Sequence, residues 1–123
     1  MSTDGLTTYL FLAAALAFVA WRVWSARLTR QQLATLRDDN AVIVDVRSAG
    51  EFRSGANPRS RNIPLDALHA QLASLDRSRT IVLCCASGAR SGRAAAILRG
   101  AGFPNVINAG PWRNTLSLTA RRM

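Results

Sequence analysis

The sequence predicts an α/β fold, a small parallel β-sheet flanked by helices and preceded by one transmembrane helix. Residues 6–24 are mostly apolar and carry one charge, Arg22, which predicts the membrane segment. The short apolar runs AVIVDV, at 41–46, and IVLC, at 81–84, have the length and β-branched content of buried strands. Helical patterns separate these runs, and strands that alternate with helices form parallel sheets.

Composition narrows the classes of partner and cofactor. The chain has 123 residues and a formal charge of +9, and all its basic residues are arginines. Such a charge suits small anions or an anionic membrane surface. Because the arginines are scattered and form no single tract, we expect no nucleic-acid partner. Cys84 and Cys85 are adjacent and belong to no CxxC or His/Cys cluster, so we expect a reducing compartment, no metal and no cofactor.

The N-terminal segment predicts how the chain is divided. We expect a short tail over residues 1–5, a transmembrane helix over 6–24, a juxtamembrane linker over 25–30 and a globular domain over 31–123. At about 1.5 Å per residue, the helix covers most of a hydrocarbon core about 30 Å thick. Aromatic residues lie near both of its ends, where their rings favour the headgroup level: Tyr9, Trp21 and Trp24.

Charged flanks predict the orientation. Asp4 is the only charged side chain before the segment, whereas Arg22, Arg27 and Arg30 lie at or after its end. The positive-inside rule therefore predicts a single-pass protein of the cell inner membrane with its domain in the cytoplasm. A cleaved signal peptide is one alternative, but the basic n-region is missing. A buried core helix is another, and it leaves the arginines unexplained.

The first half of the domain shows recognisable start signals. Thr29 opens a capping-box pattern, which predicts a short helix ending before residues 38–40. After the strand at 41–46, Ser48 and Glu51 form a second capping box and predict a helix through Phe52. Residues 53–61 are loop and 62–64 extended. A further helix is predicted from four leucines on one face: Leu65, Leu68, Leu72 and Leu75.

The second half repeats the strand-and-helix pattern. The strand at 81–84 leads through a loop at 85–90 into an alanine-rich helix, which ends at Gly100 or Gly102 as its C′ glycine. We expect a final strand at 106–108 and a turn at 109–112, and then one more helical turn within 114–120.

The loop CASGAR, at 85–90, carries the chemistry. Small side chains between a strand and a helix expose backbone N–H groups, and the helix dipole favours negative charge there. We therefore expect the pKa of Cys85 to lie below the ~8.5 of a free thiol. Arg90 adds a fixed positive charge. Asp45 and Arg47 end the neighbouring strand, at the sheet edge where such folds bind ligands. The alternative is a structural turn with a buried cysteine.

Four segments in order resemble the rhodanese family over residues 28–112. They are VIVDVRSAGEF at 42–52, RNIPL at 61–65, CASGARSGRAA at 85–95 and AGFPNVINAGPW at 101–112. Two departures stand out. The family's histidine is replaced at Ala56, and its closing Gly-Gly pair is Ala109-Gly110.

The resemblance implies a thiosulfate sulfurtransferase-like enzyme. Cys85 would carry a persulfide between a small anionic sulfur donor, such as thiosulfate or a persulfide, and a thiol or cyanide acceptor. Asp45 and Arg47 would support the loop, and we expect Arg47 to pair with Glu51. The residues that would bind substrate are Ala86, Ser87, Gly88, Ala89, Arg90 and Ser91.

Two other functions stay open. A non-catalytic docking or sulfur-sensing module would keep the fold without turnover. Rhodanese-like phosphatases and arsenate reductases are disfavoured, because the phosphatases carry one more residue between cysteine and arginine than the four found here.

Remaining residues receive simpler interpretations. Alternation along the strand turns Cys84 away from Cys85, so we expect a core cysteine and not a resolving thiol. His69 is expected on the surface. Trp112 either covers the pocket rim or packs in the core. Residues 121–122 form a solvated basic tail or contact anionic lipid.

Overall fold

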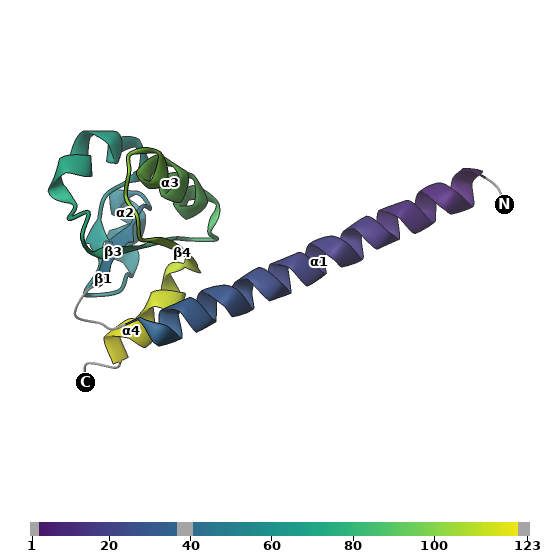
Figure 1. Cartoon of the computed structure of the whole chain (residues 1–123), viewed down its shortest axis with the longest axis horizontal. Helices are drawn as coiled ribbons and strands as arrows, with labels where there is room; N and C mark the ends of the chain where they lie inside the picture. The colour runs from purple at the N-terminus through teal and green to yellow at the C-terminus, as the bar shows by residue number, and fades with distance from the viewer. Residues whose placement is uncertain (1–2, 37–40, 121–123) are drawn as a thin grey trace.

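A computed structural model describes residues 3–36 and 41–120 of the chain (Figure 1). A long helix, α1 (Thr3–Thr35), leads into a small α/β domain. Its strands are β1 (Ala41–Asp45), β2 (Arg61–Asn62), β3 (Thr80–Cys85) and β4 (Val106–Pro111). Its α-helices are α2 (Ala49–Ser54), α3 (Ala89–Gly100) and α4 (Leu116–Ala120), and its 3₁₀ helices are η2 (Leu65–Ala67), η3 (His69–Ser74) and η4 (Trp112–Thr115).

Helix α1 is longer than the predicted membrane segment. By length and composition, residues Thr3–Leu33 can cross a membrane, with a mean hydropathy of 1.7 over an 18-residue window whose side chains are all exposed. Residues 25–30, the expected juxtamembrane linker, continue this helix. The predicted Thr29 capping box is wrong, because the Thr29 hydroxyl lies inside the helix and donates to the Ser25 carbonyl at 3.0 Å.

All strands of the sheet are parallel, in the order β2-β1-β3-β4. This confirms the predicted parallel sheet. The central strands β1 and β3 pair along their whole length, from Ala41 beside Thr80 to Asp45 beside Cys84. Their carboxyl ends therefore meet at one edge of the sheet. The predicted turn at 109–112 is wrong, since β4 continues to Pro111 after a shift in its register with β3 at Leu83/Cys84.

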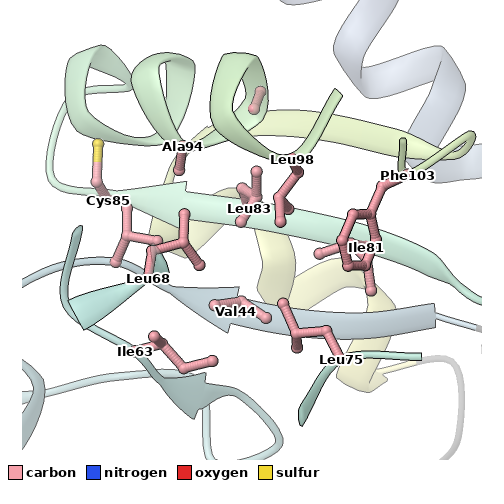
Figure 2. Close-up of a cluster of buried hydrophobic side chains, with 12 residues drawn as sticks. Val44, Ile63, Leu68, Leu75, Ile81, Leu83, Cys85, Ala94, Leu98 and Phe103 are labelled. Atoms are coloured by element: carbon pink, nitrogen blue, oxygen red, sulfur yellow. The ribbon is translucent and has the colours of Figure 1, made fainter. Parts of the chain in front are cut away.

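Each face of the sheet packs against its own cluster. One cluster lies under α3 and the 3₁₀ helices η2 and η3, and Figure 2 shows Leu83, Cys85 and Leu98 within it. The opposite face packs against Leu33 of α1 and Leu118 of α4. The two helices thus close the second face, and the C-terminal end of α1 is part of the domain's core.

One predicted helix takes a different form, and the structure decides between the two glycines predicted at the end of another. The leucine-patterned segment makes the 3₁₀ helices η2 and η3 and no α-helix. The leucine pairs 65/68 and 72/75 are three residues apart, a spacing that places side chains one above the other in a 3₁₀ helix as well. At the end of α3, Gly102 has a φ of 91° and its N–H donates to the Arg99 carbonyl, while that of Phe103 donates to Leu98. Gly102, and not Gly100, is therefore the C′ glycine of a Schellman motif.

Helix α1 ends at Thr35, before residues 38–40 as the sequence predicted. The expected basic tail at 121–122 lies outside the described residues.

Candidate functional site

Cys85 lies at the junction of β3 and α3. It is the last residue of the strand, where the sequence had suggested the first residue of the loop. Helix α3 also begins earlier than expected, at Ala89, so Arg90 and Ser91 occupy its first turn. Gly88, in the turn between β3 and α3, has a φ of 104°, and a Cβ there would come 3.2 Å from the Gly110 Cα atom. Only glycine fits this tight turn without strain.

Hydrogen-bond donors surround the Cys85 sulfur. The Gly88 N–H donates to Sγ at 2.9 Å, and the Ser91 hydroxyl oxygen lies 3.4 Å away. Cys85 is fully buried, and Figure 2 shows its sulfur on the α3 side of the sheet. Burial raises the pKa of this thiol, but hydrogen bonds from Ser91, Gly88 and the Ser87 backbone outweigh that effect, so the pKa is lowered overall.

The adjacent cysteine has the opposite environment. Cys84 is also fully buried, but it packs in the second cluster, on the far face of the sheet. Its side chain thus points away from that of Cys85, as alternation predicts. Burial, helped by the nearby Asp45 charge, raises the pKa of the Cys84 thiol to about 12. This cysteine is a neutral core residue at physiological pH.

Asp45 and Arg47 form a buried ion pair at the end of β1. Arg47 Nη2 lies 2.8 Å from Asp45 Oδ2, and Arg47 Nε contacts both carboxylate oxygens at 3.0 Å. Arg47 also donates to the Gly55 carbonyl at 2.6 Å, which fixes the loop that follows α2. Its guanidinium lies 5.1 Å from the centre of the Trp112 ring. Trp112 therefore packs over Arg47 and against the second cluster.

The expected pairing of Arg47 with the Glu51 carboxylate is wrong. Arg47 reaches only the Glu51 backbone carbonyl, at 3.4 Å. The carboxylate instead takes two hydrogen bonds from Arg90, at 2.7 and 3.0 Å. This bond to Arg90, more than any other group, lowers the pKa of Glu51 to about 2. Ser48 caps α2 as predicted, with Glu51 completing the capping box.

Asn108 completes the site, and the sequence analysis did not single it out. Its Oδ1 lies 2.6 Å from the Ser91 hydroxyl oxygen and accepts from the Gly110 N–H at 3.0 Å, while its Nδ2 donates to the Gly88 carbonyl at 3.3 Å. Asn108 pairs with Leu83 in the sheet, so its side chain points to the α3 face. A polar residue ending the apolar run Val106-Ile107 was the available signal.

A second residue that the sequence analysis missed lies next to Ala56. The adjacent Asn57 is fully buried, and its Nδ2 donates to the carbonyl and hydroxyl oxygens of Thr115 at 3.2 and 3.1 Å. Its own Oδ1 accepts from the Arg59 N–H at 2.9 Å. Asn57 therefore holds the loop after α2 against η4.

A hollow of about 550 Å³ opens beside the Cys85 loop. Arg90 lines it, so it adjoins the first turn of α3. Its wall is largely apolar and also carries charged side chains; the lining residues are Val46, Ser48, Ala49, Pro64, Leu65, Asp66, Arg90, Arg93 and Ile97. Arg90 and Arg93 bring positive charge to this wall next to the loop, and Asp66 brings one negative charge.

Within residues 3–36 and 41–120, no group of three or more His, Cys, Asp or Glu side chains is placed to hold a metal ion. His69 is exposed on η3, as predicted.

Comparison with known proteins identifies the family, since residues 29–109 match the Rhodanese-like domain. The chain belongs to the rhodanese-like domain family. It is 35% identical over 82 residues to the thiosulfate sulfurtransferase GlpE of Ectopseudomonas mendocina, covering 67% of this chain and 75% of GlpE. It is 32% identical over 78 residues to a sulfurtransferase of Allochromatium vinosum, covering 63% and 71%.

Solved structures agree with this assignment. A rhodanese with anions from E. coli has a TM-score of 0.57 and 29% identity, and the match covers 60% of this chain and 89% of that one. A rhodanese-like domain protein from Staphylococcus aureus also has a TM-score of 0.57, with 26% identity over 68% of this chain and 78% of its own. The predicted rhodanese-like fold is thereby confirmed. The family match, over residues 29–109, leaves out most of α1.

Proposed function

We propose that this rhodanese-like protein transfers sulfane sulfur through a persulfide on Cys85. The observation that carries the proposal is the ring of donors around Sγ, from Ser87, Gly88 and Ser91, which lowers the pKa of the thiol. A buried thiolate with fixed donors is a ready nucleophile.

The first step loads the enzyme. The Cys85 thiolate attacks the outer sulfur of thiosulfate, so that a new S–S bond forms at Cys85. The original S–S bond of thiosulfate breaks, and sulfite leaves with its electron pair. The terminal sulfur of the persulfide carries a negative charge, and the amides of the loop that stabilise the thiolate also stabilise this anion.

The second step removes the sulfur from the enzyme. A thiolate or cyanide acceptor attacks the terminal sulfur and forms a new bond to it. The S–S bond to Cys85 breaks, and its electron pair restores the thiolate. Each step conserves electrons between donor and acceptor, so the cycle needs no separate oxidant or cofactor.

The surrounding residues divide the work of binding. Ala86, Ser87, Gly88 and Ala89 provide the backbone of the anion cradle, and Ser91 adds its N–H and its hydroxyl. Arg90 would attract the sulfur donor at the mouth of the hollow. The donor would compete there with the Glu51 carboxylate for the Arg90 guanidinium. Asp45 and Arg47 would support the cradle indirectly, since their ion pair at the end of β1 fixes the loop after α2 through Gly55. The apolar wall suits an organic thiol or persulfide better than thiosulfate alone.

One observation favours a second candidate, a non-catalytic docking or sulfur-sensing module. Cys85 is fully buried and Arg90 is already engaged by Glu51, an arrangement that restricts access to the sulfur even though the hollow lies beside it. Such a module would hold one sulfur without releasing it repeatedly. A phosphatase is less favoured, because four residues separate Cys85 from Arg90 and the cradle is correspondingly narrow for phosphate.

Steady-state kinetics separates these functions. With thiosulfate and cyanide both varied, we expect many turnovers and parallel lines in double-reciprocal plots, the pattern of a ping-pong mechanism. Release of no more than one thiocyanate per chain would support the sensing module and contradict the enzyme. Hydrolysis of a phosphate ester with no thiocyanate formed would contradict both.

We also propose that α1 anchors the protein in the inner membrane, with the rhodanese domain in the cytoplasm. The helix is long and apolar enough to span, and its aromatic residues and arginines are arranged as membrane ends require. Alkaline extraction of membranes should leave the full chain in the pellet, and release into the supernatant would contradict a spanning helix. Substituting Arg22, Arg27 and Arg30 by Gln should weaken the preference for a cytoplasmic domain in a protease-protection assay.

A further inference from the structure

The side chain of Asn108 can adopt only one of its two amide orientations. Its Oδ1 accepts from the Gly110 N–H at 3.0 Å and its Nδ2 donates to the Gly88 carbonyl at 3.3 Å. A flipped amide would place a donor against a donor and an acceptor against an acceptor. Gly92 leaves room for this amide, since a Cβ there would come 3.4 Å from Nδ2. Backbone groups therefore fix an acceptor oxygen facing α3.

This oxygen determines where the Ser91 hydroxyl hydrogen points. Only 2.6 Å separates Ser91 Oγ from Asn108 Oδ1, and the single hydrogen available between these two oxygens is that of the hydroxyl. Its other acceptors are farther away, the Gly88 carbonyl at 3.2 Å and Cys85 Sγ at 3.4 Å. While Cys85 is a neutral thiol, the hydroxyl thus donates to Asn108 and presents a lone pair to the S–H.

Charge on the sulfur reverses this preference. A thiolate or a persulfide at Cys85 has no proton to give, and it attracts the hydroxyl hydrogen more strongly than a neutral amide oxygen does. Rotation about one bond of Ser91 moves the hydrogen from Oδ1 to sulfur. Asn108 keeps its bond to Gly110 meanwhile, so it loses one of two donors and is not left unpaired.

We infer that Asn108 is a positioning residue that competes with the Cys85 sulfur for the Ser91 hydroxyl hydrogen, and so limits how strongly the sulfur anion is stabilised. This inference builds on the proposed function, in which Cys85 carries the sulfur. Its chemical consequence is a more reactive nucleophile, because a thiolate that is stabilised too strongly attacks more slowly.

Other charged groups around the sulfur stay fixed in this exchange. Arg90 of α3 is held by Glu51 of α2, and the Asp45–Arg47 pair occupies the end of β1. Cys84 faces the other side of the sheet and is neutral. The hydroxyl of Ser91 is therefore the one rotatable donor that the described structure places at Sγ.

A double-mutant cycle tests the inference through the thiolate itself. The titration of Cys85 is followed by the ultraviolet absorbance of its thiolate in the full chain, with Cys85→Ala as the blank. We expect Asn108→Ala to lower the pKa of Cys85 by about one unit, because the hydroxyl then gives up no bond to Asn108 when its hydrogen turns to the sulfur anion. Ser91→Ala should raise the pKa, and adding Asn108→Ala to Ser91→Ala should leave it unchanged.

The sign of the shift separates positioning from structural support. If Asn108 only held the loop in shape, its loss would weaken the donors from Gly88 and Ser87 and raise the pKa of Cys85. A raised pKa in Asn108→Ala, or an equal shift with and without Ser91, would overturn the inference. Asn114→Ala is the matched control, since Asn114 also donates to a backbone carbonyl near the end of β4, that of Ala109 at 2.8 Å, and is expected to leave the pKa unchanged.

Activity is not needed for this readout. If the protein failed to transfer sulfur but the cycle behaved as expected, the proposed function would fail and the link from Asn108 to Ser91 and Cys85 would stand. The reverse outcome would leave sulfur transfer intact and remove the link.

Discussion

Cys84 and Cys85 are neighbours in sequence, and both are fully buried, yet their surroundings give them different chemistry. Cys84 meets apolar side chains and the charge of Asp45, and the pKa of its thiol rises to about 12. Cys85 meets N–H and O–H donors at the start of α3, and its pKa falls. Burial alone therefore does not silence a thiol. What distinguishes the two is the side of the sheet and the presence of donors that replace water.

Substituting each cysteine should give the largest contrast. Cys85→Ala removes the nucleophile, so we expect thiosulfate:cyanide activity to fall by at least about a thousandfold. Cys84→Ala removes one buried sulfur and should keep activity within about threefold, at a cost of about 1–2 kcal/mol in the free energy of unfolding. Steady-state rates and denaturant titration check both. Comparable losses of activity in the two variants would contradict the assignment of Cys85 as nucleophile and Cys84 as core residue.

The backbone on the Cys85 face can be tested through two glycines, one at each end of α3. Gly88→Ala places a side chain at a φ of 104°, 3.2 Å from the Gly110 Cα atom, and should reduce the free energy of unfolding by about 1–3 kcal/mol. It also displaces the N–H that donates to Sγ, so activity should fall with it. Gly100→Ala is the matched control, because a Cβ there meets nothing within 4 Å. We expect that variant to be as stable as the parent or up to about 1 kcal/mol more stable. Equal effects at both sites would show that the tight turn is not under constraint.

Alkaline unfolding should report the buried Cys84 thiol. In the unfolded chain this thiol loses its proton near the ~8.5 of a free thiol, whereas in the folded chain burial holds its pKa at about 12. Between these values the unfolded state binds fewer protons, so the free energy of unfolding should fall with rising pH, by about 1.4 kcal/mol per unit. The lowered pKa of Cys85 has the opposite sign: it stabilises the fold above the pKa of an unfolded cysteine and loses this effect as pH falls through the folded value.

Comparison with Cys84→Ala isolates that contribution from other groups that titrate in alkali. The difference in unfolding free energy between parent and variant should shift with pH only above about 9. A constant difference across this range would contradict the burial of a neutral thiol.

The smallest expected effect concerns the ion pair at the mouth of the site. Glu51→Gln keeps the capping box, in which glutamine substitutes for glutamate, and releases Arg90. Because both partners are more than a third exposed, the pair is worth little, and we expect the KM for thiosulfate to fall about two- to fivefold. Asp66→Asn is the control, a carboxylate that lines the same hollow. An equal fall in that variant would point to general charge and not to Arg90.

Much of this arrangement could be predicted from the sequence, because it depends on local patterns. The apolar runs marked the central strands, Ser48 and Glu51 marked α2, and strand alternation placed Cys84 and Cys85 on opposite faces. Contacts between distant elements left no such pattern. Glu51 pairs with Arg90 across 39 positions, and Asn108 meets Ser91 only because the pairing of β3 with β4 turns its side chain toward α3.

Helix boundaries failed for a related reason. The Thr29 pattern fits a capping box, but the same hydroxyl is satisfied inside a helix by the carbonyl four residues earlier. Which of the two occurs depends on the apolar residues around it, and these continue α1 onto the second face of the sheet through Leu33.

Mass spectrometry of the thiosulfate-treated protein is the most direct measurement of the central claim. The full chain, freed of excess thiosulfate under conditions that preserve persulfides, should gain the mass of one sulfur, and fragmentation should locate it on Cys85 and not on Cys84. Cys84→Ala should gain the same mass and Cys85→Ala none. An added sulfur on Cys84, or none on either cysteine, would contradict a persulfide carried by Cys85.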